Sequence, residues 1–180
     1  MAFPEDDNIL QSAHQENGAN DAAETVACDI LPMRDQRAVV FHLLYVFDAF
    51  EYDVSLDTVT DGFFTYFNCI ITPTSVVYQK TRAIVEERAT LDEAIKPLLH
   101  NWRFERLSVS TKLVLRLALW ELMHTDLAVS VVINEALELS KCFAEEDAHK
   151  FINGVLDEWV KIHKPAAHDA STQTTDTPQI

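Results

Sequence analysis

A short polar segment, EEDAHK, lies between two apolar stretches near the C-terminal end of the chain, from Glu145 to Lys150. Its carboxylates and imidazole belong to the residue types that ligate metals or transfer protons. The sequence contains none of the ligand spacings HExxH, HxxE or CxxC, so no metal site is predicted. At the first turn of a helix, Glu145 or Asp147 would instead cap free amides. The segment is therefore either a capped joint between helices or a binding surface.

Nucleophilic chemistry could use the thiol of Cys142 with the imidazole of His149. The sequence shows no activating environment for this thiol, and a free Cys usually packs in a core. Cys28, Cys69 and Cys142 have no paired spacing, so we expect three unpaired thiols in a reducing compartment. No Gly-rich phosphate loop is present, because the chain has only 3 glycines. We expect no catalytic site and no cofactor.

Helices are the elements expected to position these residues. The low numbers of Gly (3) and Pro (6) argue against a protein built from a multi-strand sheet. Apolar residues recur at helical spacing in 34–53, from about residue 74 and in 148–159, and Pro97 should divide the helix that contains it. Residues 55–70 also favour a helix, with a strand as the alternative. Residues 108–126 are apolar on almost every face, as in a helix at the centre of a bundle. The sequence predicts an all-α fold.

The charge of the chain is uneven. The formal net charge is -15, and residues 1–33 hold seven acidic residues and no Lys or Arg. All 14 basic residues lie in 34–164 with 20 acidic ones, which is a poor basis for unaided nucleic-acid binding. The composition predicts disordered tails in 1–31 and 164–180 around a helical domain in 32–163. No signal peptide or membrane-spanning segment is evident, so we expect a cytoplasmic protein.

Three linked motifs stand in the C-terminal half of the chain, between Glu105 and Val160. They are VLRLALWEL, VVINEALELSKCF and EEDAHKFINGVLD. In this order they resemble the NusB transcription antitermination family, and RDQRAVVFHLLYVFDAF is similar to the first helix of that family. The resemblance covers about 34–162. It implies an all-helical fold of two small bundles packed across each other, with about seven helices.

The resemblance also implies a function. Members of this family are non-catalytic and bind a short boxA-type element of single-stranded nascent RNA. They act with a NusE-type ribosomal small-subunit protein in an RNA polymerase elongation complex, which keeps transcription from terminating early. We therefore expect an RNA-binding antitermination factor. The alternative is a protein-only adaptor that keeps the fold and the partner surface but binds RNA weakly.

The family's RNA-binding positions lie at the start of the first helix and near the start of the last one. The residues that match are Arg34, Arg37, Tyr45, Asp147, Lys150 and Phe151. Met33 and Asp35 stand where family members often have further Arg. This difference removes part of the salt-sensitive attraction for phosphate and motivates the adaptor alternative.

The carried-over residues also have structural interpretations. Tyr45 and Phe151 could stack on bases or pack in the core, and Asp147 could accept from a base or cap a helix. Asn134, Glu135 and Asn153 match family positions too, and we expect them to bond backbone groups at the joint. The acidic residues 1–31 could fold over the first-helix arginines as a mimic of RNA.

Overall fold

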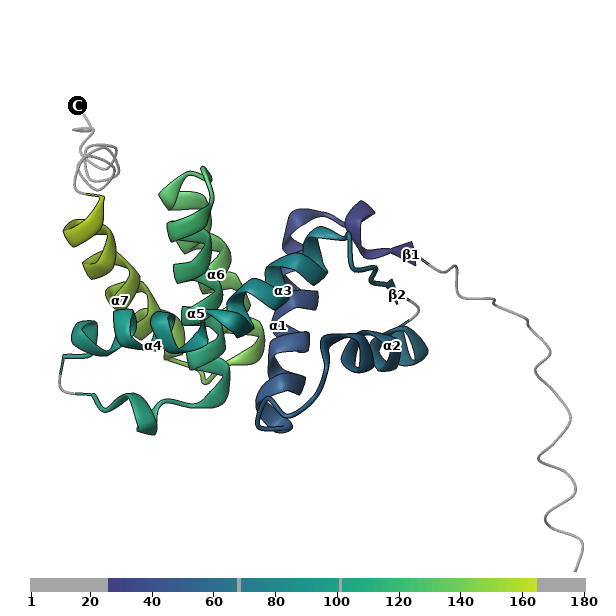
Figure 1. Ribbon diagram of the computed structural model, residues 1–180. Helices are drawn as coiled ribbons and strands as arrows, with labels where there is room; N and C mark the ends of the chain where they lie inside the picture. Colours follow the sequence, from purple (N-terminus) through teal and green to yellow (C-terminus); the bar gives the residue numbers. More distant parts are fainter. Residues whose placement is uncertain (1–25, 68, 101, 165–180) are drawn as a thin grey trace, which may run out of the picture.

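The chain folds into seven α-helices over the residues that this computed structural model describes, which are 26–67, 69–100 and 102–164 (Figure 1). The helices are α1 (Met33–Ala49), α2 (Leu56–Phe67), α3 (Val76–Glu86), α4 (Arg88–Ile95), α5 (Val109–His124), α6 (Val129–Phe143) and α7 (Ala148–His163). Shorter elements are the 3-10 helices η1 (Cys28–Ile30), η2 (Lys96–Leu98) and η3 (Phe104–Arg106), and the strands β1 (Val26–Ala27) and β2 (Cys69–Ile70). The predicted all-α fold is confirmed.

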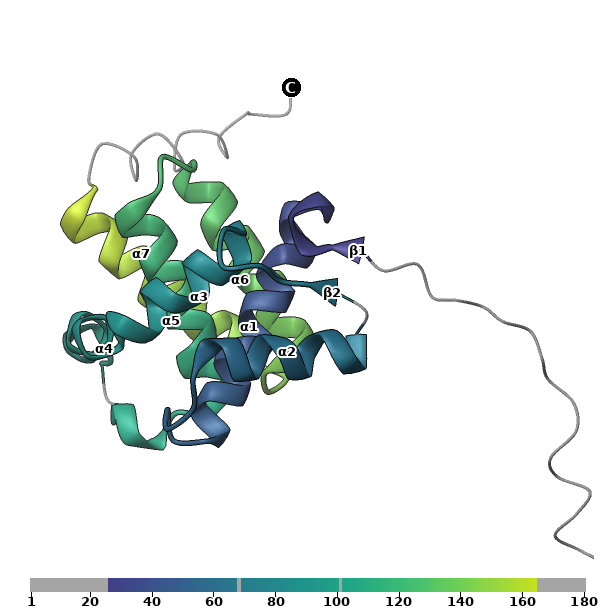
Figure 2. The ribbon, with the colours of Figure 1, turned by 45° about the vertical axis from the view of Figure 1, so that its right-hand side comes forward.

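The helices form two groups that meet along α1 and α5. In Figure 1, α1, α2 and α3 lie together beside the β1–β2 pair, and α4, α5, α6 and α7 lie together on the other side. Figure 2 shows α1 near the centre of the molecule, next to α2. The arrangement agrees with two small bundles packed across each other.

The core is built around α5, because apolar residues cover nearly all of its faces. Ten of its 16 residues are buried, which makes it the central helix that the sequence predicts. The first turn of α5 is capped by Ser108, whose Oγ accepts from the Thr111 amide over 3.2 Å. The apolar stripe of α7, including Ile152, Leu156 and Trp159, faces the same core.

Turn residues set the ends of the shorter helices. Pro97 lies in η2, so α4 ends at Ile95, in agreement with the predicted break. Residues 55–70 contain both predicted alternatives, because α2 runs to Phe67 and the short strand β2 follows. Within the described part of the chain, every helix is too short or too polar to cross a lipid bilayer.

Cys28 and Cys69 form a disulfide, so the prediction of three unpaired thiols is wrong. Strand β1 pairs in parallel with β2, and this pairing brings the two cysteine Cα atoms to 5.7 Å. Cys142 is the free cysteine and is exposed. Ordered structure thus begins by Val26, ahead of the predicted boundary at residue 32. The rest of the predicted tails, 1–25 and 165–180, lies outside the described residues.

Candidate nucleic-acid interface

The joint between α6 and α7 carries two of the predicted residues on its surface. Asp147 directly precedes α7, but its carboxylate makes no capping hydrogen bond. Instead, Lys150 Nζ donates to Asp147 Oδ1 over 2.7 Å, and the two side chains are 71% and 77% exposed, respectively. This hydrogen bond lowers the pKa of Asp147. The pair is accessible to a ligand, but each charge is partly compensated by the other.

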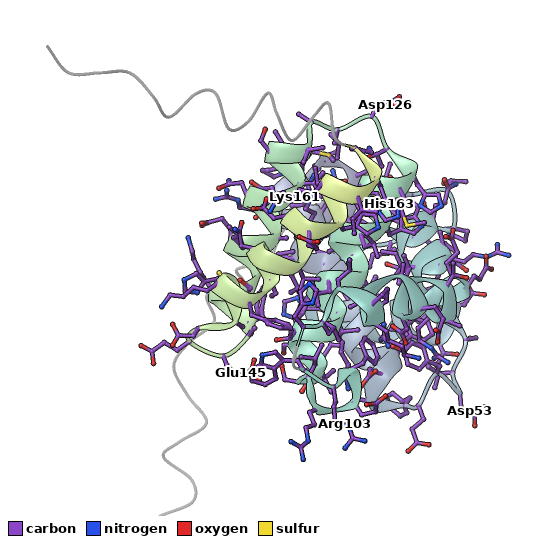
Figure 3. The ribbon with its side chains drawn as sticks, turned by 90° about the vertical axis from the view of Figure 1, so that its left-hand side faces the viewer. Asp53, Arg103, Asp126, Glu145, Lys161 and His163 are labelled. Atoms are coloured by element: carbon purple, nitrogen blue, oxygen red, sulfur yellow. A yellow bond between two sulfur atoms is a disulfide. The ribbon has the colours of Figure 1, made fainter. Side chains whose placement is uncertain are left out.

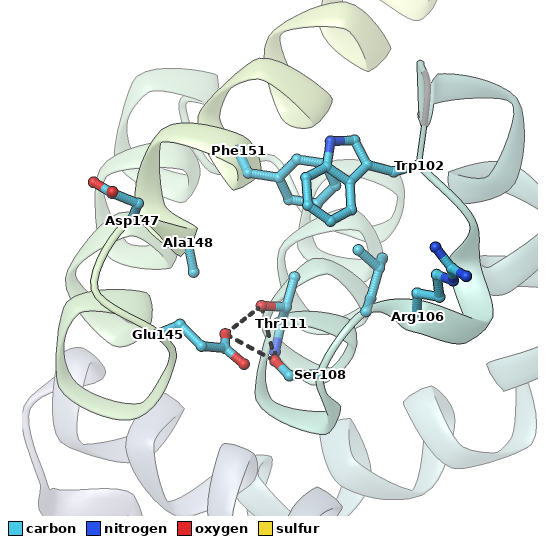
Figure 4. Close-up of a pocket in the computed structure, with 9 residues that line it drawn as sticks. Trp102, Arg106, Ser108, Thr111, Glu145, Asp147, Ala148 and Phe151 are labelled. Atoms are coloured by element: carbon cyan, nitrogen blue, oxygen red, sulfur yellow. Dashed lines mark hydrogen bonds between the residues drawn. The ribbon is translucent and has the colours of Figure 1, made fainter.

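Glu145 fastens the same joint to the start of α5 (Figure 4). The hydroxyls of Ser108 and Thr111 lie 2.9 and 3.3 Å from Glu145 Oε2 and donate to it. The hydrogen bond from Ser108 is the main cause of the lowered pKa of Glu145. The carboxylate predicted to cap α7 therefore fixes the joint against the first turn of α5.

A pocket of about 320 Å³ opens between this joint and the loop before α5. Trp102, Arg106 and Phe151 are among the residues that line it (Figure 4). The Trp102 and Phe151 rings meet edge to face, with centroids 5.7 Å apart, and Trp102 is 58% exposed. An accessible aromatic surface with a cation nearby is suited to an unstacked base and its phosphate.

Arg34 lies on the surface at the start of α1 but is engaged by Glu135 of α6. Its Nε and Nη2 donate to the Glu135 carboxylate over 3.1 and 2.8 Å. Glu135 therefore bonds a side chain, not the backbone groups that we expected, and the hydrogen bond from Arg34 lowers its pKa. The Arg34 side chain is 56% exposed. A phosphate that binds Arg34 must compete with a bidentate carboxylate.

Arg37 is buried, with its side chain only 4% exposed. Its Nε donates to the two Glu121 oxygens over 3.1 and 2.9 Å. Lys80 Nζ donates to Glu121 Oε1 over 2.6 Å, so two cations share this carboxylate. The network joins α1, α3 and α5. Arg37 thus has a structural role in this network, and the burial of its guanidinium gives no support to the prediction that it contacts RNA.

Tyr45 lies on the surface of α1 and is 48% exposed. Phe41, one turn earlier, occupies the core side of the helix. The Phe41 ring stacks on Phe143 of α6 with centroids 4.8 Å apart, and its centroid lies 6.4 Å from that of Tyr45. Part of the Tyr45 ring is therefore accessible, which is the condition for stacking on a base.

The structure gives no support to catalysis by Cys142 and His149. His149 Nδ1 lies 3.0 Å from the carbonyl oxygen of Glu146, and no contact between His149 and Cys142 is found among the described residues. The described residues also hold no group of three or more side chains that could bind a metal ion.

Three exposed residues of the pocket region were missed by the sequence reasoning. Trp102, Arg103 and Arg106 lie in the loop before α5, and Trp102 and Arg106 line the pocket. The segment WRFER holds two aromatic and two basic residues, with Glu105 before the last arginine. Aromatic and basic residues together are typical of surfaces that bind single-stranded nucleic acid, and this composition was the available signal in the sequence.

A family model and curated relatives match this chain. The model of the NusB family matches residues 34–161. The transcription antitermination protein NusB of Staphylococcus epidermidis is 42% identical over 80 residues, which cover 44% of this chain and 62% of that protein. That of Anaeromyxobacter dehalogenans is 47% identical over 76 residues, covering 42% and 54%. The chain thus spans somewhat more than half the length of the curated relatives that it matches.

Solved structures match the fold. NusB from T. maritima superposes with a TM-score of 0.64 at 31% identity, covering 78% of this chain and 98% of that chain. A chain in the crystal structure of a plectonemic RNA supercoil superposes with a TM-score of 0.58 at 21% identity, covering 79% and 97%. At that identity the second likeness shows the fold alone. From the family model, which matches most of the helical domain, and from the nearly complete coverage of T. maritima NusB, the chain belongs to the NusB family.

Proposed function

We propose that this protein is a non-catalytic transcription antitermination factor. It binds boxA-type single-stranded RNA together with a NusE-type ribosomal protein, as part of an RNA polymerase elongation complex. The observation that carries the proposal is membership of the NusB family through residues 34–161, because the curated relatives are transcription antitermination proteins.

Exposed aromatic groups support the RNA-binding part of the proposal. Tyr45 on α1 and Trp102 beside the pocket are both about half exposed, and Phe151 lines the same pocket. Single-stranded RNA is bound by stacking its bases on aromatic side chains, since every base offers a π-face. Arg106 in the pocket lining adds positive charge for a phosphate.

The cations of the expected RNA surface are paired or buried, which supports a requirement for a partner protein in RNA binding. Arg34 is bound to Glu135, Lys150 is bound to Asp147, and Arg37 is buried. Affinity for RNA rises with the number of phosphates that a protein neutralises. We therefore expect weak RNA binding by this chain alone and tighter binding by its complex with the NusE-type protein.

A gel-shift experiment tests this function. A boxA-type RNA and a scrambled RNA are titrated with the protein, alone and with the NusE-type partner, at low salt. The expected result is a shifted complex with the boxA-type RNA that the partner strengthens. No shift under either condition would refute RNA binding.

A protein-only adaptor is the second candidate function, and the same compensated cations favour it. It predicts tight binding to the NusE-type protein with no retention of RNA. The variant Met33→Arg/Asp35→Arg should then restore RNA binding, because both side chains are exposed at the start of α1. Failure of this variant to bind RNA counts against the adaptor.

A further inference from the structure

Four of the five residues from Trp102 to Arg106 are exposed, the acidic Glu105 among them. Phe104 is half-buried, and the ammonium groups of Lys96 and Lys112 lie 5.8 and 5.4 Å from its ring centroid. The Arg106 amide donates to the Arg103 carbonyl over 3.0 Å, which closes the η3 turn. With Phe104 anchored inward, Trp102, Arg103 and Arg106 are left exposed.

The two arginines of this segment differ from the other cations of the expected RNA surface. Arg34 and Lys150 each have a carboxylate partner within 2.8 Å. Neither Arg103 nor Arg106 forms an ion pair with any residue of the described ranges. A phosphate can therefore bind these two guanidinium groups without displacing an acid.

The pocket places an aromatic surface next to this free charge. Trp102, Arg106 and Phe151 of α7 line the pocket, and the Trp102 and Phe151 rings lie next to each other (Figure 4). Proteins that bind a single strand combine an aromatic face for a base with a cation for a phosphate, and this pocket holds both. An acidic protein surface could bind the arginines, whereas a single strand of RNA offers a phosphate for each arginine and a base for the indole.

We propose that the Trp102–Arg106 segment is a contact surface for single-stranded RNA, in which Trp102 stacks on a base and Arg103 and Arg106 bind phosphates. This inference rests on the proposed RNA-binding function. It moves the main phosphate contacts from the start of α1, where Arg37 is buried, to the loop before α5.

The double variant Arg103→Gln/Arg106→Gln tests the phosphate contacts. Its binding to a boxA-type RNA, in the presence of the NusE-type protein, is measured over a series of salt concentrations. Loss of two phosphate contacts should weaken binding by about tenfold or more at 0.1 M salt and reduce the slope of log K against log salt by about 1.4.

The matched control is Arg82→Gln/Lys161→Gln, which removes the same charge from exposed positions elsewhere. Figure 3 shows Lys161 on α7, well apart from Arg103. This control should keep the wild-type slope. Equal losses in the two double variants would overturn the proposal, because bulk charge would then explain the effect.

Trp102→Ala and Trp102→Phe test the stacking contact. The Ala variant should lose about fivefold to 150-fold in RNA affinity, whereas the Phe variant should retain most of it. RNA should also quench tryptophan fluorescence in the wild type, and Trp102→Phe should remove that quenching, because Trp159 is buried and Trp120 is half-buried. Thermal unfolding of the variants separates a folding defect from a lost contact.

The outcomes distinguish this inference from the proposed function. If the wild type binds no RNA, the proposed RNA-binding function and this inference both fail. If the wild type binds RNA and the Trp102 and arginine variants bind it equally well, only this inference fails. If the variants lose affinity for the NusE-type protein but keep RNA, the segment is a protein interface and the inference is wrong.

Discussion

Arg34 and Arg37 stand three residues apart at the start of α1 but have different roles. Arg37 and Lys80 are the cations around the buried Glu121 carboxylate. Arg37→Ala would leave that carboxylate with one cation, so we expect a loss of about 3 kcal/mol in the free energy of unfolding, measured by urea denaturation. Arg34→Ala, at an exposed position, should cost much less. Equal losses for the two variants would contradict the buried role of Arg37.

The sequence indicated part of this difference between Arg34 and Arg37. Arg37 precedes Val40, Phe41 and Leu44 by three, four and seven residues, which places it on the buried face of α1. Its partner Glu121 lies 84 residues further along the chain, and no local pattern indicates that pairing. The resemblance named both arginines as RNA contacts, and helical spacing is what separates the buried arginine from the exposed one.

Glu135 links the stability of the protein to pH. Arg34 lowers its pKa below the ordinary value of 4.5 in the folded state. A lowered pKa contributes stability above the unfolded value, and this contribution is lost as the pH falls through the folded pKa. The free energy of unfolding of the wild type should thus exceed that of Glu135→Gln at pH 7, and the difference should shrink below about pH 4.5. Urea denaturation from pH 7 to pH 3 measures it, and a constant difference would argue against the pair.

At the scale of elements, the turn after α1 fixes that helix against α4 and α5. Tyr52 has a φ of 63°, its hydroxyl donates to Asp48 over 3.1 Å, and Arg116 donates to that hydroxyl over 2.9 Å. The Arg88 guanidinium lies 3.8 Å from the centroid of the Tyr52 ring. These contacts hold the left-handed turn in place.

Glu51 adopts the same left-handed conformation, with a φ of 52°, on the exposed side of the turn. A residue with a Cβ is strained there, and glycine is not. Glu51→Gly should therefore raise the free energy of unfolding by about 0.5 kcal/mol, after the greater freedom of glycine in the unfolded chain is subtracted. Thermal unfolding measures the gain. Glu51→Ala is the control, and a similar gain in it would show that strain is not the cause.

Elements with a strong apolar pattern were predictable from the sequence, and elements defined by distant pairing were not. The buried faces of α5 and α7 are those that the apolar spacing of their sequences predicts. α4 ends just before Pro97, because proline lacks the backbone amide that a helix interior needs. Strands β1 and β2 have only two residues each, too few for a periodic signal. The pocket likewise joins the loop before α5 to α7, so its residues become neighbours only after folding.

At the scale of the whole molecule, the disulfide fixes a turn that contacts two helices. Asp29, next to Cys28, accepts from the Val76 amide at the start of α3 through Oδ1 over 3.0 Å. Gln36 of α1 donates through Nε2 to the Asp29 carbonyl over 3.1 Å. The disulfide from Cys28 to Cys69 also links this turn to β2. The N-terminal end of the described chain is thereby joined to the α1–α3 group.

Removal of this bond should destabilise the fold mainly by freeing the unfolded chain. The cysteines are 41 residues apart, and a loop of that size corresponds to about 4 kcal/mol in the chain-entropy account. Cys28→Ala/Cys69→Ala should thus unfold at lower urea concentration, as should the wild type treated with a dithiol reductant. Cys142→Ala is the control, because that thiol is free and exposed. Alkylation of the denatured, unreduced protein should modify Cys142 alone, and modification of all 3 cysteines would refute the bond.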